Sequence, residues 1–358
     1  AMMDHVNVTS ELCGRKCDLT KGCLAFEIFE VAPKSCYIFV GELQAPFYPV
    51  AQCFTCVRNS TATVRARPPS PRRQLAASSK PALTGFRLGN GQFLLNGKPI
   101  RLFAGSLQHF RIHPQHWEHR LALARAMGLN AVQTLIPWMM MEPHPGEFRT
   151  DGFMDIVQFA KLAQKAGLLI VLRPGPFICD GPDYGGFPWW LTQQNTPATA
   201  NPDAPGALLR VRTADPAFLH RVDLFFTKLF ALLRTEKLTA DLGGPIVMAQ
   251  VDNEYGLFSN DHKYLERIRD MWRKGLGDGV VIHSTDPASR HVLDASRLQG
   301  VLQTVDFATA SDPAADFATL RASQSLVSAT PQPLMVSEFY PGYLTSVGGS
   351  QFPIIYDP

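Results

Sequence analysis

The chain has 358 residues, of which 46% are hydrophobic and 18% charged, and this composition excludes a disordered protein. Its net charge of +3 argues against a domain-wide nucleic-acid-binding face, and its apolar runs are far shorter than the ~20 residues of a membrane span. We therefore expect a globular protein of two or three domains with no nucleic-acid partner and no membrane span.

The first 61 residues form a cysteine-rich segment. The opening Ala1-Met2-Met3-Asp4 lacks the charged and apolar regions of a signal peptide, so we expect the start of a mature chain or of a fragment. Six of the seven cysteines follow within this segment: Cys13, Cys17, Cys23, Cys36, Cys53 and Cys56. An even number in so short a stretch predicts a disulfide framework, because a module of this size has a small core. The sequence leaves the pairing open.

Zinc binding is the alternative for part of these cysteines. Cys53 and Cys56 have the spacing of a zinc-ligand pair, but no second pair repeats it, which favours disulfides. Two N-glycosylation sequons, beginning at Asn7 and Asn59, also favour an oxidising compartment. We therefore expect a protein of the secretory pathway, either extracellular or in the cell wall, or lysosomal or vacuolar.

A resemblance to a known family covers this segment. Cys23-Leu-Ala-Phe-Glu27, followed by Cys36-Tyr-Ile-Phe39, resembles the PAN/apple family of small disulfide-bonded modules. The resemblance implies that residues 1–61 form a PAN/apple-like module that binds protein or glycan. A tethered module with no ligand of its own is the alternative.

Residues 62–83 differ in composition from both neighbouring segments. They are rich in Pro, Arg, Ser and Ala, with Arg67-Pro-Pro-Ser-Pro-Arg-Arg73 at the centre, and they show no apolar periodicity. Such a composition predicts a partly extended linker. Contact with anionic glycans and cleavage by a protease are alternative uses of the arginine cluster.

Residues 84–358 alternate between strand and helix patterns. Asn90-Gly91 and Asn96-Gly97 predict hairpin turns at the start. Strands are then predicted at 102–107, 130–138, 168–172, 246–251, 280–284, 301–307 and 334–337. Helices are predicted at 114–127, 154–166, from Pro216 onward, at 264–274 and at 315–322.

This alternation predicts an α/β fold. Because no glycine-rich phosphate loop follows an early strand, a (β/α)8 TIM barrel fits better than a doubly wound sheet. The eighth strand is not evident, so we expect either an incomplete barrel or a truncated chain.

Two glutamates follow predicted strands. Glu254 ends the fourth and Glu338 ends the seventh, and barrel enzymes place their chemistry at these strand ends. Glycoside hydrolysis needs such a pair, because one carboxylic acid protonates the leaving oxygen while the other carboxylate attacks the anomeric carbon. Trp138, near another strand end, is a candidate for stacking on a sugar ring. The alternative is structural, with either glutamate capping a helix or pairing with an arginine.

A second resemblance extends from about residue 86 to residue 348. This stretch resembles the catalytic barrel of glycoside hydrolase family 35, the beta-galactosidases. The matching blocks include Gly105-Ser-Leu-Gln-His-Phe-Arg111, Leu172-Arg-Pro-Gly-Pro-Phe-Ile-Cys179, the segment from Gln250 to Gly256, and Ser337-Glu-Phe-Tyr-Pro-Gly342. The resemblance implies a retaining mechanism with Glu254 as general acid/base and Glu338 as nucleophile, and Asn253 binding the sugar 2-hydroxyl.

The sequence also departs from the family pattern. Leu135 stands where the family has Tyr, and Met139 where it has Asn. Gly181 replaces the Glu that holds galactose hydroxyls, and Asp180, one position earlier, is a candidate substrate-binding substitute. The glycine-rich block of the final strand and the C-terminal β-sandwich domains of the family are not evident.

Other polar groups have weaker claims. Four histidines, His109, His113, His116 and His119, lie close in sequence, but no metal-binding motif accompanies them, so we expect no metal and no cofactor. His109 is an alternative candidate for the sugar pocket. Arg173 is predicted to be a structural or site-lining ion-pair partner, and Cys179 a buried thiol near the pocket.

The leading hypothesis is a retaining exo-glycosidase that hydrolyses terminal non-reducing beta-D-galactosyl residues. Its substrates are expected to be oligosaccharides, polysaccharides or glycoconjugates. Two alternatives remain. One keeps the chemistry but acts on another beta-linked sugar such as glucosamine, because the hydroxyl contacts differ. The other is a non-catalytic glycan-binding protein.

Overall fold

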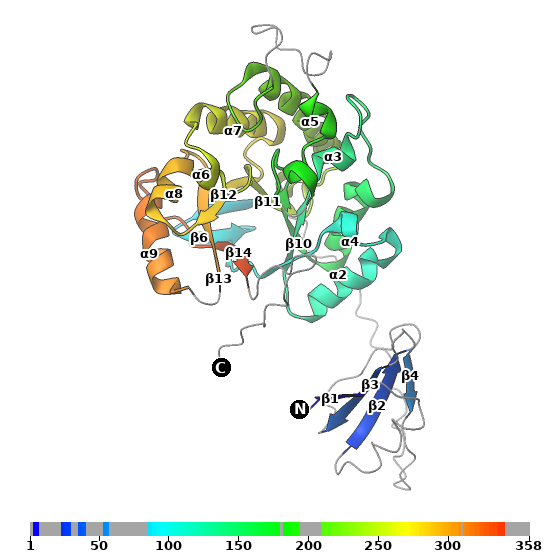
Figure 1. Cartoon of the computed structure of the whole chain (residues 1–358). Helices are drawn as coiled ribbons and strands as arrows, with labels where there is room; N and C mark the ends of the chain where they lie inside the picture. Colours follow the sequence, from blue (N-terminus) through cyan, green and yellow to red (C-terminus); the bar gives the residue numbers. More distant parts are fainter. Residues whose placement is uncertain are drawn as a thin grey trace. The chain divides into compact units, whose positions relative to one another are not determined.

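The computed structural model describes residues 85–179, 182–193, 209–308 and 311–340, and the backbone of four strands nearer the N-terminus. The chain divides into two compact units, Ala1–Lys80 and Pro81–Pro358 (Figure 1). The linker predicted at 62–83, both sequons, Asp180 and Gly181 lie outside the described residues.

The N-terminal unit contains a four-stranded antiparallel sheet. Its strands are β1 (Met3–Val6), β2 (Cys23–Phe29), β3 (Ser35–Val40) and β4 (Cys53–Cys56). They are ordered β1-β3-β2-β4. Four of the six cysteines in this unit fall on these strands, and β2 pairs with both β3 and β4.

The second unit begins with a three-stranded antiparallel sheet formed by β5 (Phe86–Gly89), β6 (Gln92–Leu95) and β7 (Lys98–Ile100). The two Asn-Gly turns are confirmed. Asn90 and Asn96 have φ of 52°, and the glycines after them have φ of 71° and 77°, which is the left-handed geometry of tight hairpin turns.

Seven parallel strands follow, paired in the order in which they occur along the chain. They are β8 (Ala104–Ser106), β9 (Ala131–Leu135), β10 (Leu169–Arg173), β11 (Ile246–Gln250), β12 (Val281–Pro287), β13 (Leu302–Ala308) and β14 (Val336–Tyr340). The seven predicted strands are therefore confirmed. β9, β10 and β11 are buried along their whole length, as expected for a parallel sheet covered by helices.

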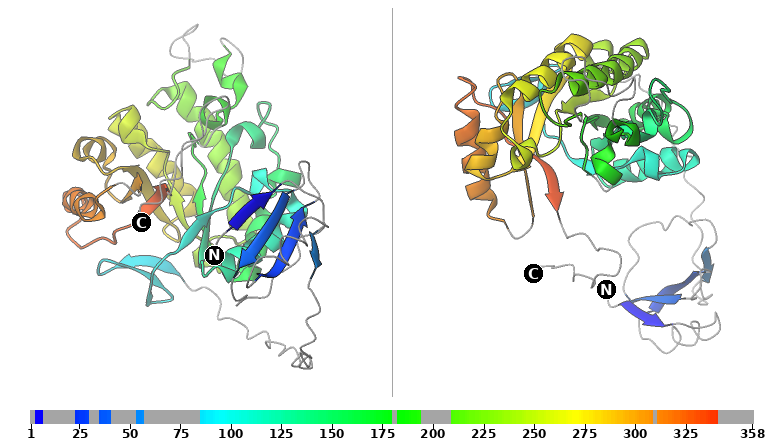
Figure 2. Two further views of the ribbon diagram at one scale, coloured as in Figure 1. Left: turned by 60° about the horizontal axis from the view of Figure 1, so that its bottom comes forward. Right: turned by 45° about the horizontal axis from the view of Figure 1, so that its top comes forward.

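The helices lie around the outside of the curled sheet (Figures 1 and 2), which gives an α/β TIM-like barrel. The α-helices are α2 (Trp117–Ala126), α3 (Trp138–Met141), α4 (Ile156–Ala166), α5 (Pro216–Thr235), α6 (Tyr255–Phe258), α7 (His262–Leu276), α8 (Arg290–Ser296) and α9 (Pro313–Gln324). Short 3-10 helices are η1 (His109–Arg111), η2 (Pro114–His116), η3 (Gly152–Met154), η4 (Asp183–Gly186), η5 (Trp189–Thr192) and η6 (Ala240–Leu242). No helix in these described segments is both long and apolar enough to cross a membrane.

Local sequence signals explain where the main helices begin and end. The carboxylate of Asp215 accepts hydrogen bonds from the N–H groups of Ala217 and Phe218 at the start of α5, and Pro216 occupies the first helical position. At the end of α4, Gly167 adopts a left-handed conformation with φ of 75°. These helix boundaries agree with the sequence prediction.

The two ends of the barrel have different roles. Phe86 and Phe93 of the three-stranded sheet stack on each other, with ring centroids 5.6 Å apart. They join an apolar cluster with residues at the beginnings of the barrel strands, such as Leu169 and Val281. This packing covers the N-terminal ends of the strands, so an active site in this barrel would lie at their C-terminal ends.

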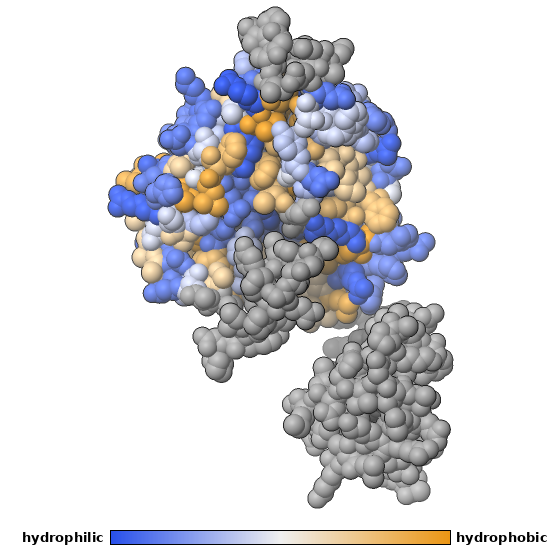
Figure 3. Space-filling view, viewed as in Figure 1, coloured by the Kyte–Doolittle hydropathy of each residue, from blue (hydrophilic) through white to orange (hydrophobic). Residues whose placement is uncertain are grey.

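The main core lies between the sheet and its helices. Buried aromatic side chains of α5 pack against one another and against Trp272 of α7, for example Phe226 and Phe230, whose centroids are 5.0 Å apart. Burying each such side chain contributes about 1.5–3 kcal/mol, which fixes the helices against the strands. On the face of the barrel unit seen in Figure 3, hydrophilic and hydrophobic residues are interspersed.

Candidate active site

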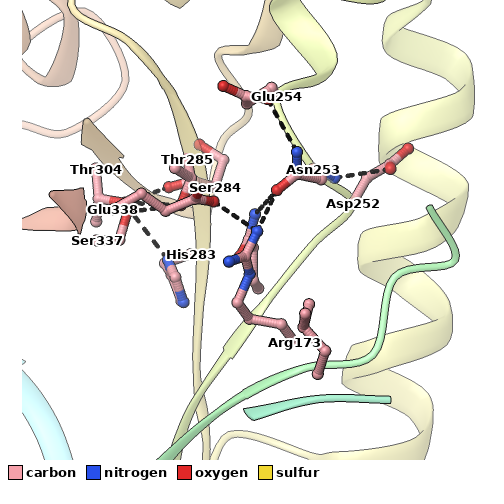
Figure 4. Close-up of polar contacts among 12 residues, drawn as sticks. Arg173, Asp252, Asn253, Glu254, His283, Ser284, Thr285, Thr304, Ser337 and Glu338 are labelled. Atoms are coloured by element: carbon pink, nitrogen blue, oxygen red, sulfur yellow. Dashed lines mark hydrogen bonds and ion pairs between the residues drawn. The ribbon is translucent and has the colours of Figure 1, made fainter. Parts of the chain in front are cut away.

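The two predicted catalytic glutamates and Arg173, the predicted ion-pair partner, lie at the C-terminal edge of the parallel sheet. Arg173 is the last residue of β10, Glu254 comes after β11, and Glu338 is in β14. Parallel strands all end at the same edge, so residues far apart in the chain come together (Figure 4). The structure thus brings Glu254 and Glu338 into one polar network.

Both oxygens of the Glu338 carboxylate have a protein partner. Nη2 of Arg173 lies 2.5 Å from Oε1, and the two side chains are only 8% and 14% exposed. The hydroxyl of Tyr340 donates a hydrogen bond to Oε2 at 2.7 Å. Burial and the charge of Glu338 raise the pKa of Tyr340, so its phenol stays protonated and remains a donor.

Gln133 of β9 holds the other side of the Arg173 guanidinium. With its amide oriented to satisfy both neighbours, the oxygen of Gln133 accepts from Nη1 of Arg173 at 2.9 Å and its nitrogen donates to the Ser337 carbonyl at 3.0 Å. This side chain ties Arg173 to the strand that carries Glu338. Sequence analysis assigned this side chain no role, because a single Gln inside a strand is common.

Glu254 lies in a sharply turned segment at the start of α6. Its φ and ψ are 43° and 48°, and Asp252 has φ of 54°. A non-glycine residue in this left-handed region costs about 1–2 kcal/mol, so the surrounding contacts must hold the segment in place. The Glu254 N–H donates to the Thr285 carbonyl at 3.2 Å, and Asn253 Nδ2 donates to Glu254 Oε2 at 3.0 Å.

Arg212 supports this turned segment from outside the strands. Its Nη2 donates to the Asn253 carbonyl at 2.5 Å and lies 3.4 Å from Oδ1 of Asp252. The guanidinium carbon lies 4.0 Å from the ring centroid of Phe177 and 4.5 Å from that of Phe258, within the range of cation–π attraction. Sequence reasoning missed Arg212 because no motif marks it.

Asp252 completes the support beneath the segment. Its carboxylate accepts from the hydroxyl of Tyr264 at 2.8 Å and from the Asn253 N–H at 2.7 Å. Burial raises the pKa of Asp252, while Arg212 and the hydrogen bonds act in the opposite direction. The same Asp252 therefore joins α7 to the backbone that orients Glu254.

Asn253 links the two halves of the network. Its Oδ1 accepts from Arg173 and from Gln250 Nε2, the latter at 3.1 Å, while its Nδ2 contacts Glu254. Asn253 therefore connects the cation beside Glu338 with the carboxylate of Glu254. Its predicted role in binding a sugar hydroxyl remains a prediction.

A buried group of hydroxyls lies beside Glu338. Ser337 Oγ is 2.6 Å from Thr285 Oγ1 and 2.5 Å from Thr304 Oγ1. His283 Nδ1 lies 3.5 Å from the same Thr304 oxygen, and burial lowers the pKa of His283 to about 3, so the imidazole is neutral. These neutral groups tie β12, β13 and β14 together without adding charge beside Glu338.

Trp138 is placed differently from the prediction. It begins α3, is 1% exposed, and stacks on Phe225 with centroids 4.9 Å apart. Its Nε1 donates to Glu142 Oε2 at 2.8 Å. A ring whose faces are covered by core side chains has no surface for a sugar, so this burial argues against the stacking role.

Cys179 also differs from its prediction as a buried thiol. It is exposed and has φ of 63°. Partial burial raises the pKa of its thiol, as do the charges of Glu254 and Glu338. Cys179 thus lies beside the glutamate pair, as expected from sequence, but in a solvent-accessible position.

The histidine cluster does not form a metal site in the described part of the chain. His109 is buried, its Nδ1 is 2.9 Å from Thr134 Oγ1, and burial lowers its pKa to about 3. Across the described segments, His, Cys, Asp and Glu side chains form no group of three or more that could hold a metal ion. The polar network around Glu254 and Glu338, at the C-terminal edge of the sheet, is the candidate active site.

Comparisons with known proteins agree with this geometry. Three relatives are Beta-galactosidase 17 of Arabidopsis thaliana (36% identical over 269 residues), Beta-galactosidase of Felis catus (38% over 261) and Beta-galactosidase of Homo sapiens (37% over 257). The matches cover 74%, 73% and 72% of this chain but only 36%, 36% and 35% of the relatives, so the chain spans about a third of their length. The model of the family described as "Glycosyl hydrolases family 35" matches residues 92–354. The chain therefore belongs to glycosyl hydrolases family 35.

Proposed function

We propose that this chain carries the catalytic barrel of a retaining exo-glycosidase that removes terminal non-reducing beta-D-galactosyl residues. The observation that carries this proposal is the meeting of Glu254 and Glu338 at one sheet edge, with Arg173 and Tyr340 as the partners of the two Glu338 oxygens. Family membership and the beta-galactosidase names of the relatives supply the sugar.

The chemistry follows from the two carboxyl groups. In the first step Glu254 donates a proton to the glycosidic oxygen, Glu338 attacks the anomeric carbon, and the bond to the leaving group breaks. In the second step Glu254 takes a proton from water, which attacks the same carbon and releases Glu338. Asn253 lies beside Glu254, where its amide would contact the sugar 2-hydroxyl.

Release of nitrophenol from a panel of beta-linked aryl glycosides tests the proposal. We expect turnover of the galactoside, and loss of at least about 10³-fold in Glu338→Gln because the nucleophile is gone. Glu118→Gln is the matched control, because Glu118 makes an exposed ion pair with Lys165. This variant should hydrolyse the galactoside at the wild-type rate. No turnover of any glycoside by the folded chain would contradict the proposal and favour a non-catalytic glycan-binding protein.

A second candidate keeps the mechanism but changes the sugar. Leu135 and Met139 replace polar family residues, and the fully buried Leu135 offers no hydroxyl to a substrate. A site that loses polar partners discriminates poorly in favour of the original sugar. Turnover of a glucosaminide in the same panel, without turnover of the galactoside, would support this candidate.

For the N-terminal part we propose a PAN/apple-like disulfide module at residues 1–61, a linker at 62–83 and the catalytic domain at 84–358. The antiparallel sheet that carries Cys23, Cys36, Cys53 and Cys56 supports a compact module. Binding of a protein or glycan by this module, and passage through the secretory pathway, belong to the same proposal. Non-reducing peptide mapping by mass spectrometry should find three disulfides and glycans on Asn7 and Asn59, and free thiols would contradict it.

A further inference from the structure

A third carboxyl group adjoins the two glutamates. Asp306 lies in β13, and its Cα is the register partner of Glu338 in the neighbouring strand. Its side chain lies within hydrogen-bonding reach of the Glu254 carboxyl group. Asp306 is 5% exposed, and its buried Oδ1 has no hydrogen-bond partner.

The charges around Asp306 do not favour its ionised form. Arg173 is paired with Glu338, and Arg212 with Asp252. The groups that act on Asp306 within the described barrel are Glu254, Glu338 and the Tyr340 phenol, and its register neighbour on β12 is the uncharged Pro287. Burial, followed by the hydrogen bond to Glu254 and the charges of both glutamates, raises the pKa of Asp306 to about 9.

Two carboxyl groups can share a hydrogen bond only if one of them holds the proton. We propose that Asp306 is a positioning residue of the active site, whose neutral carboxylic acid donates a hydrogen bond to Glu254. The inference rests on the proposed glycosidase function and extends it.

The hydrogen bond would act in both steps of the reaction. Asn253 Nδ2 already contacts Oε2 of Glu254 from one side, and Asp306 holds the same carboxyl group from a different strand. Two fixed partners limit rotation of Glu254, and misplacing a catalytic group by about 1 Å costs on the order of 10²-fold in rate. Asp306 itself transfers no proton to the substrate.

Two substitutions separate this role from its alternatives. Asp306→Ala should lower kcat for an aryl galactoside by about 10²-fold with a small effect on KM, because the orientation of Glu254 is lost. Asp306→Asn keeps a donor of the same shape and should recover most of that loss. Equal loss in both variants, or no loss in Asp306→Ala, would overturn the proposal.

The pH profile provides a readout that a purely structural role would not move. With a dinitrophenyl galactoside, whose leaving group needs no proton, turnover depends on Glu254 only as the base of the second step, and it should fall through about pH 9 as Asp306 ionises and Glu254 loses its partner. In Asp306→Asn this fall should be absent. The same fall in wild type and variant would contradict a role for the Asp306 proton.

Infrared spectroscopy of the full chain tests the proton directly, even if no glycoside is turned over. A carboxylic acid C=O band should disappear with a midpoint near pH 9 and be missing from Asp306→Asn. Asp286→Asn is the control. Burial raises the pKa of Asp286 to about 7, so the Asp286 band of the wild type should have the lower midpoint, and this variant should lose that band but keep the band near pH 9. A wild-type spectrum without the band near pH 9 would overturn the inference whatever the activity.

Discussion

Arg173 and Glu338 meet across the inside of the barrel, with Nη2 and Oε1 2.5 Å apart. Their strands are not neighbours, because β11, β12 and β13 lie between β10 and β14 in the sheet. Side chains from strands so far apart touch only if the sheet is curled. The ion pair is therefore both a consequence of the barrel shape and a means of fixing the position of the Glu338 side chain.

Replacing Arg173 should disable the site. In Arg173→Met the charge of Glu338 loses its cation and Asn253 loses a donor, so we expect kcat/KM for an aryl galactoside to fall by about 10²–10³-fold. Steady-state kinetics measure this effect. The matched control is Arg149→Met, since Arg149 makes an exposed ion pair with Glu147. Equal activity in the two variants would contradict the assigned role.

Removal of Arg212 should affect both stability and rate. Arg212→Ala leaves Asp252 buried without its cation and frees the Asn253 carbonyl, so we expect a loss of about 3–5 kcal/mol in the free energy of unfolding. Turnover should fall as well, because the turned backbone at Glu254 loses its support. Arg290→Ala, at an 85% exposed position, should change stability by less than about 0.5 kcal/mol in the same denaturant titrations.

Trp138 should behave as a core residue. Trp138→Ala removes the ring that stacks on Phe225, and we expect the free energy of unfolding to fall by about 3–5 kcal/mol. Trp189→Ala, at a half-exposed position, should cost clearly less. If Trp138→Ala instead raises KM strongly without loss of stability, Trp138 contacts the substrate.

Acid should destabilise the fold partly through His283. Its pKa is about 3 in the folded chain and near 6.5 when unfolded, so below pH 6.5 the unfolded chain takes up a proton that the folded chain does not. Stability contributed at this site is present above about pH 6.5 and is lost as the pH falls. Melting temperatures of wild type should therefore drop relative to His283→Gln between about pH 7 and pH 4.

The comparison between wild type and variant is essential in this experiment. The raised pKa values of Asp286 and Asp306 act with the opposite sign over the same pH range, because these folded carboxyls hold protons that the unfolded chain releases. His119→Gln controls for loss of an imidazole from the surface. If the melting temperatures of wild type and His283→Gln change equally with pH, a buried neutral His283 is contradicted.

The sequence predicted the strands and the glutamate pair because both depend on local pattern. Alternation of apolar runs with helical periodicity located all seven strands, and strand order placed Glu254 and Glu338 at the fourth and seventh. The four-residue helices α3 and α6 and the seven-residue α8 were missed because they are too short to show a helical period.

The network around the glutamates could not be predicted in the same way. Gln133, Arg212 and Asp306 become neighbours of the site only when distant strands and loops meet, and nothing in the local sequence assigns any of them a role there. Trp138 misled the prediction for the opposite reason. It follows a strand end, as site residues do, but the first turn of α3 directs its ring into the core.

The agreement between strand order and chain order has a consequence for biosynthesis. Each barrel strand from β9 to β14 pairs with the strand made just before it, so the sheet can grow one unit at a time as the chain leaves the ribosome. Of these strands, β14 is synthesised last. It brings Glu338 to Arg173, which lies at the end of the earlier strand β10. A nascent chain that stops before β14 therefore leaves the Arg173 guanidinium without the carboxyl group of Glu338, and this ion pair forms only after β14 has joined the sheet.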